Sequence, residues 1–155
     1  MKWFIIICCV FSFSYSEFNR KDDIVGVENS NIKMNLAIKN AQKTLPIFLK
    51  AFRKHDKAQY EFGVKVKITD KYGSEHFWTT DLKELKNGFS AKINNSPQVV
   101  QSVKYRELVN FTKLDITDWM FYDQDILQGG YTIKVMFEHM QKEDVERLKK
   151  DFGWK

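Results

Sequence analysis

The sequence predicts an α+β fold in which a kinked N-terminal helix and a short C-terminal helix pack on one face of a twisted antiparallel sheet. Apolar residues recur every three or four positions in residues 30–55 and 142–152, which is typical of helices with one buried face. Between these segments, apolar and polar residues alternate over short stretches that end in turn residues, which is typical of antiparallel strands. Such strands could also curl into a small open barrel, and the sequence leaves this alternative open.

The first expected helix covers residues 30–55. Ser30 or Asn31 can cap its start through a side-chain oxygen. Pro46 lies inside the helical pattern, and because proline lacks a backbone N–H and clashes with the preceding turn, we expect a kink at residues 42–45. The expected buried face consists of Met34, Ala37, Ala41, Leu45, Phe48 and Phe52.

Residues 60–69 are the clearest strand, because apolar and polar side chains alternate along them. A turn at residues 70–73 leads to a second strand at residues 74–80. The turn at Asn87-Gly88 leads to a third strand at residues 89–93. The remaining expected strands are residues 99–103, 107–112 and, after Gly129-Gly130, 131–137, while residues 115–122 fit either a strand or a helical turn.

The first 16 residues have the layout of a secretory signal peptide. Lys2 gives a positive start, residues 3–13 are uncharged and mostly apolar, and small residues precede the expected cleavage near Ser16. The apolar run is shorter than the roughly 20 residues that a membrane-spanning helix needs. We therefore expect a signal peptide at residues 1–16, a flexible lead-in at residues 17–29 and a single domain at residues 30–155. The mature chain would be periplasmic or secreted, with no transmembrane segment.

The composition argues against several kinds of site. Cys8 and Cys9 both lie in the leader, so the mature domain has no disulfide, thiolate nucleophile or cysteine metal ligand. The three histidines lack metal-ligand spacing, and the acidic residues 115–125 lack the glycine and closing glutamate of a calcium loop. The net charge of +5 is spread over alternating lysines and acids, which argues against nucleic-acid binding. The sequence contains no phosphate-binding glycine motif, and we expect no cofactor and no metal.

One polar cluster is the candidate for chemistry. Strand alternation places His76 and Trp78 on one face of the sheet and Glu75 on the other. A general-base role for His76 needs a carboxylate on its own face, and Asp118 from the later segment could provide it. The alternative is a structural histidine beside a packed tryptophan.

Five short motifs follow one another along the chain. They are FGVKV at residues 62–66, EHFW at 75–78, GFSAKINNSP at 88–97, ITDWM at 116–120 and GGYTI at 129–133. In this order they resemble the YegJ-like family, domain of unknown function 2314, over about residues 34–136. The chain departs from the family at residues 105–107, where the family often has a Gly-Asp or Gly-Gln turn.

The resemblance implies a fold and an export habit, and it implies no activity. It also marks characteristic positions, which we take as a candidate ligand or partner site. These positions are Glu75, His76, Trp78, Asn95, Asp118, Trp119 and Gly130, with Pro97 as a further one.

Three functions are compatible with these residues. The first, which the sequence favours, is a non-enzymatic binding or interaction module of the bacterial envelope that takes an envelope protein or a small ligand. It follows from the export signal and from the lack of a recognisable catalytic set. The second is a small hydrolase-type enzyme that uses His76 with Asp118. The third is an inhibitor or immunity-type protein that docks through a strand edge.

Overall fold

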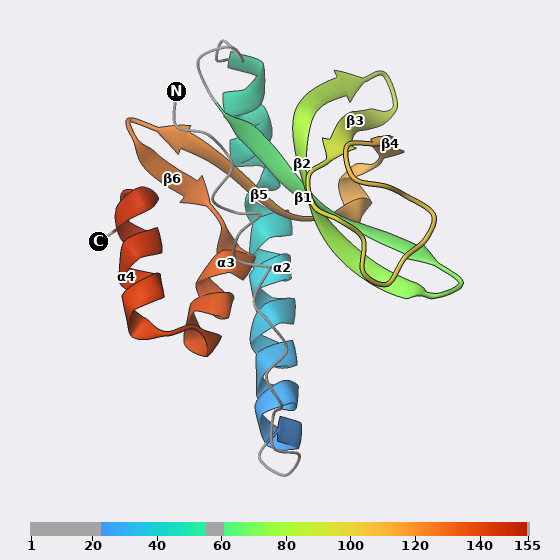
Figure 1. Cartoon of the computed structure of the whole chain (residues 1–155). Coiled ribbons are helices and arrows are strands. Elements are labelled where there is room, and N and C mark those ends of the chain that lie inside the picture. The colour runs from blue at the N-terminus through green and yellow to red at the C-terminus, as the bar shows by residue number, and fades with distance from the viewer. Residues whose placement is uncertain (1–22, 55–60, 155) are drawn as a thin grey trace.

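The computed structural model describes residues 23–54 and 61–154 (Figure 1). Its sheet has the strand order β4-β3-β2-β1-β5-β6, and every neighbouring pair is antiparallel. The two edge strands, β4 and β6, do not pair with each other, so the sheet is open and does not close into a barrel. The predicted α+β fold is confirmed.

The elements have the following bounds. The helices are α2 Asp23–Lys54, α3 Tyr131–Met136 and α4 Lys142–Asp151, and the 3-10 turns are η1 Lys113–Asp115 and η2 Phe137–His139. The strands are β1 Phe62–Asp70, β2 Gly73–Leu85, β3 Gly88–Ile93, β4 Leu108–Phe111, β5 Ile116–Asp123 and β6 Ile126–Gly129. Among the described residues, no helix is both long enough and apolar enough to cross a membrane.

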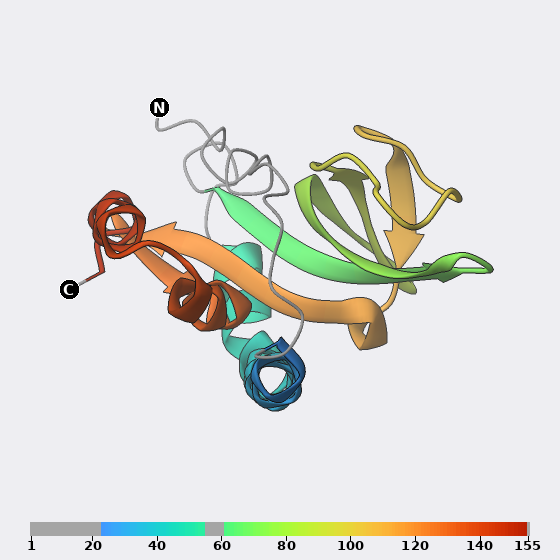
Figure 2. The ribbon, with the colours of Figure 1, turned by 60° about the horizontal axis from the view of Figure 1, so that its bottom comes forward.

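Helix α2 lies along one face of the central strands (Figure 2). Its buried positions include Ala41, Leu45 and Phe48, as the helical periodicity predicts. The ring of Phe48 lies 5.7 Å from those of Phe62 in β1 and Trp119 in β5, measured between ring centroids. This aromatic contact joins the helix to two adjacent strands of the sheet, β1 and β5.

The ends of α2 differ from expectation. The helix begins at Asp23, ahead of the expected cap at Ser30, so residues 23–29 of the expected lead-in are helical. It continues through Pro46 and ends at Lys54, and the kink stays a prediction. The expected signal peptide and residues 17–22 lie outside the described residues.

The alternating strands are confirmed over most of the chain. Phe62, Val64 and Val66 in β1 are buried on the α2 side of the sheet. Strand β2 is longer than expected, because it serves both halves of the sheet: its first part pairs with β1 and its second part with β3. The register shifts between Thr80 and Lys83, where Asp81 has a positive φ of 55°.

Residues 131–137 were expected to be a strand, and this expectation is wrong. They form α3 and the start of η2, while the strand of this region is β6, directly before them. Gly129 and Gly130 both have positive φ, which ends the strand. Asp118 of β5 then accepts hydrogen bonds from the first backbone N–H groups of α3. The alternation of apolar and polar residues along this segment predicts a strand, because it does not reveal a helix cap that another element supplies.

Two further expectations need correction. Residues 99–103 are not a strand but a segment without regular structure that lies beside the β1–β2 hairpin. The helices also do not all cover one face. In β5, Trp119 and Phe121 join the cluster under α2, whereas Met120 joins a second cluster with Leu148 of α4. Helix α4 therefore packs on the opposite face, and α3 lies between α2 and α4 (Figure 1).

We expect Phe48→Ala to lower the free energy of unfolding by about 3–5 kcal/mol, because it leaves a cavity at a fully buried position. Leu114→Ala is the matched control: this side chain is 87% exposed, and its loss should change stability by about 0.5 kcal/mol or less. Urea denaturation measures both values. Equal losses in the two variants would contradict the packing of α2 described above.

Candidate functional site

Strand β1 brings the candidate residues of β2 and β5 together. Lys65 of β1 is the cross-strand partner of Trp78 on one side and of Asp118 on the other. Directly opposed residues of antiparallel strands point to the same face, so these three side chains share the face away from α2. The Nζ atom of Lys65 lies 5.8 Å from the centroid of the Trp78 ring.

Asp118 is fully buried, and its carboxylate accepts four hydrogen bonds. Oδ1 accepts from the backbone N–H of Trp119 at 2.8 Å and of Tyr131 at 3.2 Å. Oδ2 accepts from the backbone N–H of Thr132 at 2.8 Å and from its hydroxyl at 2.7 Å. Gly130, the residue before α3, has no side chain that can cap the helix. Asp118 therefore acts as the cap of α3 from a neighbouring strand.

Lys65 is also buried, with 7% of its surface exposed. Its ammonium donates to the hydroxyl of Thr132 at 3.3 Å, and that hydroxyl donates to Asp118. Burial lowers the pKa of Lys65, opposed by the nearby charge of Asp118. Burial raises the pKa of Asp118, opposed by its hydrogen bonds and by Lys65. Sequence analysis missed this lysine, because alternation placed it on the polar face of β1 and that face is covered here.

His76 is half-buried and does not pair with Asp118. Its Nδ1 atom lies 2.9 Å from the hydroxyl oxygen of Thr117, and no hydrogen bond to Asp118 exists in the described part of the chain. Burial, with the nearby ammonium groups of Lys65 and Lys67, lowers the pKa of His76 to about 4. The imidazole is therefore neutral near pH 7. The histidine–carboxylate pair that a general base needs is not formed in this geometry.

Glu75, on the opposite face of β2, holds the segment that follows β3. Its carboxylate accepts from the backbone N–H groups of Gln98, Val99 and Val100, at 2.9–3.3 Å for the Oε2 atom. Asp70, at the end of β1, accepts in the same way from the next two residues, 101 and 102. The two carboxylates thus fix five successive backbone positions against the β1–β2 hairpin.

The remaining candidate residues also hold the backbone. Asn95 accepts a hydrogen bond from the backbone N–H of Trp78 at 3.1 Å. The indole N–H of Trp119 donates to the carbonyl of Ala41 in α2 at 2.9 Å. Gly130 has a left-handed φ of 64° and donates its N–H to the carbonyl of Trp119 at 2.9 Å. The polar atoms of these residues therefore serve to connect strands, helices and loops.

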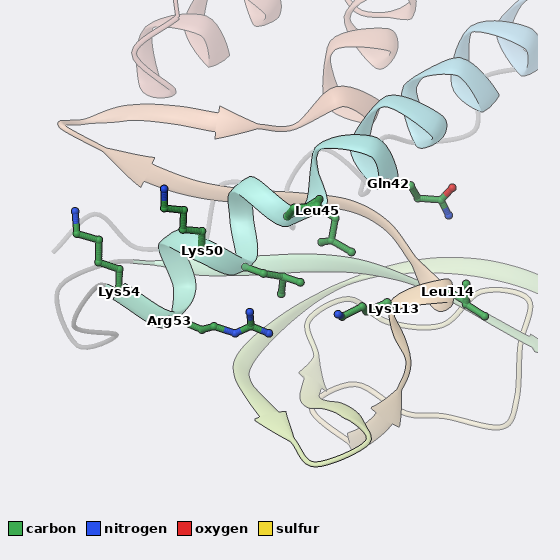
Figure 3. Close-up of a pocket in the computed structure, with 9 residues that line it drawn as sticks. Gln42, Leu45, Lys50, Arg53, Lys54, Lys113 and Leu114 are labelled. Atoms are coloured by element: carbon green, nitrogen blue, oxygen red, sulfur yellow. The ribbon is translucent and has the colours of Figure 1, made fainter.

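A groove of about 720 Å³ lies between the C-terminal half of α2 and η1 (Figure 3). None of the candidate residues lines it. The residues that line it are Gln42, Leu45, Pro46, Leu49, Lys50, Arg53, Lys54, Lys113 and Leu114. The groove combines apolar and basic side chains, and sequence analysis missed it because its two walls are far apart in the chain. In the parts of the chain that the structure describes, no group of three or more His, Cys, Asp or Glu side chains could hold a metal ion.

The comparison with protein families gives a match over residues 31–155 to the family described as "Uncharacterized protein conserved in bacteria (DUF2314)". The chain belongs to the DUF2314 family. The resemblance that the five motifs suggested is thereby confirmed.

Two relatives support the assignment of this chain to the DUF2314 family. The uncharacterized protein YegJ of Escherichia coli K12 is 33% identical, over 96% of this chain and 97% of that protein. A putative ankyrin repeat protein of Neisseria meningitidis serogroup B is 31% identical over 83% of this chain, which spans 53% of that relative. No solved structure matches the chain.

We expect the DUF2314 protein to lose stability as the pH falls from about 6.5 to about 4. The pKa of His76 is about 4 in the folded chain and 6.5 in the unfolded chain, so in this window the unfolded chain binds more protons. The loss should be on the order of 1 kcal/mol, because partial exposure screens the charges. Urea denaturation across this range measures it. His76→Gln should flatten the profile and His139→Gln, at an exposed position, should keep it; a profile unchanged by His76→Gln would contradict the assignment.

We expect Asp118→Asn to lower the free energy of unfolding by about 3 kcal/mol or more, because an NH2 donor replaces one of the two acceptor oxygens and some of the buried donors of α3 lose their acceptor. Hydrogen exchange should speed up at the backbone amides of Tyr131 and Thr132 before it speeds up in β1. Asp115→Asn, which weakens the exposed cap of η1, is the control and should leave α3 protected. Unchanged protection of α3 in Asp118→Asn would show that the cap contributes nothing.

Proposed function

We propose that this DUF2314 protein is an exported, non-enzymatic binding module of the bacterial envelope. One contrast carries the proposal. The polar atoms of the candidate cluster hold backbone groups, whereas the groove between α2 and η1 presents apolar and cationic side chains to solvent. A binding surface needs exposed side chains whose apolar area or charge is not already covered or paired within the protein, and such side chains line the groove.

The candidate cluster gives less support to a hydrolase. A general base must be within hydrogen-bond reach of the substrate or of an activating partner. Asp118 is fully buried and already accepts four hydrogen bonds, and His76 contacts Thr117. Catalysis by this pair would require α3 to leave its position, which would expose the apolar residues beneath it.

Export is supported by the first 16 residues, with their positive start, apolar run and small residues near Ser16. Cys8 and Cys9 both precede the expected cleavage, so the mature domain can enter an oxidising compartment without forming a disulfide. A binding role outside the cytoplasm is consistent with these features.

Photo-cross-linking in the producing cells tests both parts of the proposal. A photoreactive amino acid replaces Leu114, which lines the groove, or Lys142, an exposed residue at the start of α4 that serves as the control. We expect a discrete adduct from position 114 in the periplasmic or secreted fraction, none from position 142, and none when residues 1–16 are deleted.

Two results would count against the proposal. Retention of the full-length chain in the cytoplasmic fraction would contradict export. An exported chain that gives the same diffuse products from both positions would contradict binding at the groove.

A further inference from the structure

Two side chains of like charge face each other across the groove between α2 and η1. Figure 3 shows Lys113 of η1 and Arg53 of α2 pointing toward one another. The guanidinium of Arg53 is bound by Glu84 of β2, at 2.9 Å and 2.5 Å. Lys113 has no ion pair among the described residues, and the same holds for Lys50 and Lys54 at this end of the groove. Lys113 is therefore an uncompensated ammonium group that faces the neutralised guanidinium of Arg53, whereas the side chains of Lys50 and Lys54 point away from η1 (Figure 3).

The helix dipole accounts for only part of this charge. Basic residues in the last turn of a helix interact favourably with its carbonyl end, which explains Arg53 and Lys54. Lys113 belongs to a different element, and the dipole of α2 does not place it there. Because Arg53 already has Glu84 as its partner, Lys113 is the cation of the two that a carboxylate from outside could pair with.

The groove also exposes apolar surface beside these cations. Leu114, next to Lys113, is 87% exposed, which is high for a leucine. On the facing wall of α2, Pro46 is exposed, whereas Leu45 and Leu49 belong to the core and are each only 5% exposed. An occupant that covered Leu114 would bury apolar surface and could neutralise the adjacent Lys113 at the same time.

We propose that this groove docks an acidic, amphipathic peptide segment of a partner protein, an inference that rests on the binding function proposed above. Apolar side chains of the segment pack between Leu114 and Pro46, and a carboxylate of the segment pairs with Lys113. The α2 wall runs from Gln42 to Lys54, a length of about 20 Å, which fits a helical segment of about 14 residues.

The shape of the groove favours a peptide over a lipid chain. Sites for small apolar ligands typically bury about 70–90% of the ligand surface. Here the walls come from one helix and one short 3-10 turn, and an acyl chain laid along them would keep much of its surface in water. A peptide helix needs only one buried face, because its other face is polar.

Fluorescence anisotropy with the protein purified from the producing cells tests the inference. The probe is a labelled peptide of about 14 residues with leucines on one helical face and glutamates on the other. A control peptide has the same composition in an order that spreads the leucines over all faces. Vesicles of phosphatidylglycerol and phosphatidylcholine form the second arm.

We expect saturable binding of the amphipathic peptide, about tenfold tighter than that of the control peptide. Lys113→Glu should weaken binding about tenfold or more and reduce its dependence on salt. Leu114→Ser should weaken binding about tenfold and keep the salt dependence, because it removes only apolar contact. Lys142→Glu makes the same charge change on α4 and should leave the affinity unchanged. All three positions are exposed, so the variants should fold.

Three results would overturn the inference. Equal affinity for the two peptides would mean that charge alone attracts them. Binding to vesicles but not to the peptide, lost in Lys113→Glu, would make the groove a membrane-docking surface. Absence of peptide binding, with a discrete cross-link at position 114 in cells, would leave the proposed binding function intact and reject this occupant.

Discussion

The buried carboxylate of Asp118 is the constraint on which the C-terminal part of this fold depends. It lies on the middle of β5 and accepts the first N–H groups of α3, so strand and helix cannot separate without leaving a buried charge and several donors unpaired. Lys65 on the neighbouring strand reaches the same group through Thr132. Helix α4 follows α3 and packs against the second cluster, where the backbone N–H of Leu127 in β6 also donates to the carbonyl of Phe152. One short polar network thus helps to place the segment from α3 to the end of α4.

The same network explains the largest difference between the predicted and observed secondary structure. Strands such as β1 and β3 could be predicted, because apolar and polar residues alternate along them in the sequence, although the first five residues of β1 are all buried in the fold. Residues 131–136 alternate in a similar way, yet they are helical. Their conformation depends on a carboxylate 13 residues earlier in the sequence than Tyr131 and on two glycines with positive φ. Local pattern carries no information about such a contact, which only the folded sheet creates.

The sequence predicts that the candidate residues are neighbours, but it does not predict what each of them binds. His76, Trp78 and Asp118 do share one face of the sheet, as alternation and strand pairing imply. Their roles could not be predicted, because these roles depend on backbone groups that come near them only in the folded chain. The groove was harder still to predict, because strands β1 to β4 lie between Arg53 and Lys113 in the sequence. Neither element is unusual alone, and only their juxtaposition gives a mixed apolar and cationic surface.

The hydrogen bonds that Asp70 and Glu75 accept from residues 98–102 affect which sequence changes the domain tolerates. These carboxylates accept hydrogen bonds from the backbone N–H groups of residues 98–102, and Asp70 is also hydrogen-bonded by the side chain of Ser102. Val100 is buried, Val99 packs over Gly73 and Ser102 bonds to Asp70, whereas the exposed side chains of Gln98 and Gln101 can change with little effect on the fold. Insertions or prolines are another matter, since either would misplace or remove a donor. The length of residues 98–102 is thus constrained more than the identity of their exposed side chains, so these side chains could vary while the backbone keeps its position.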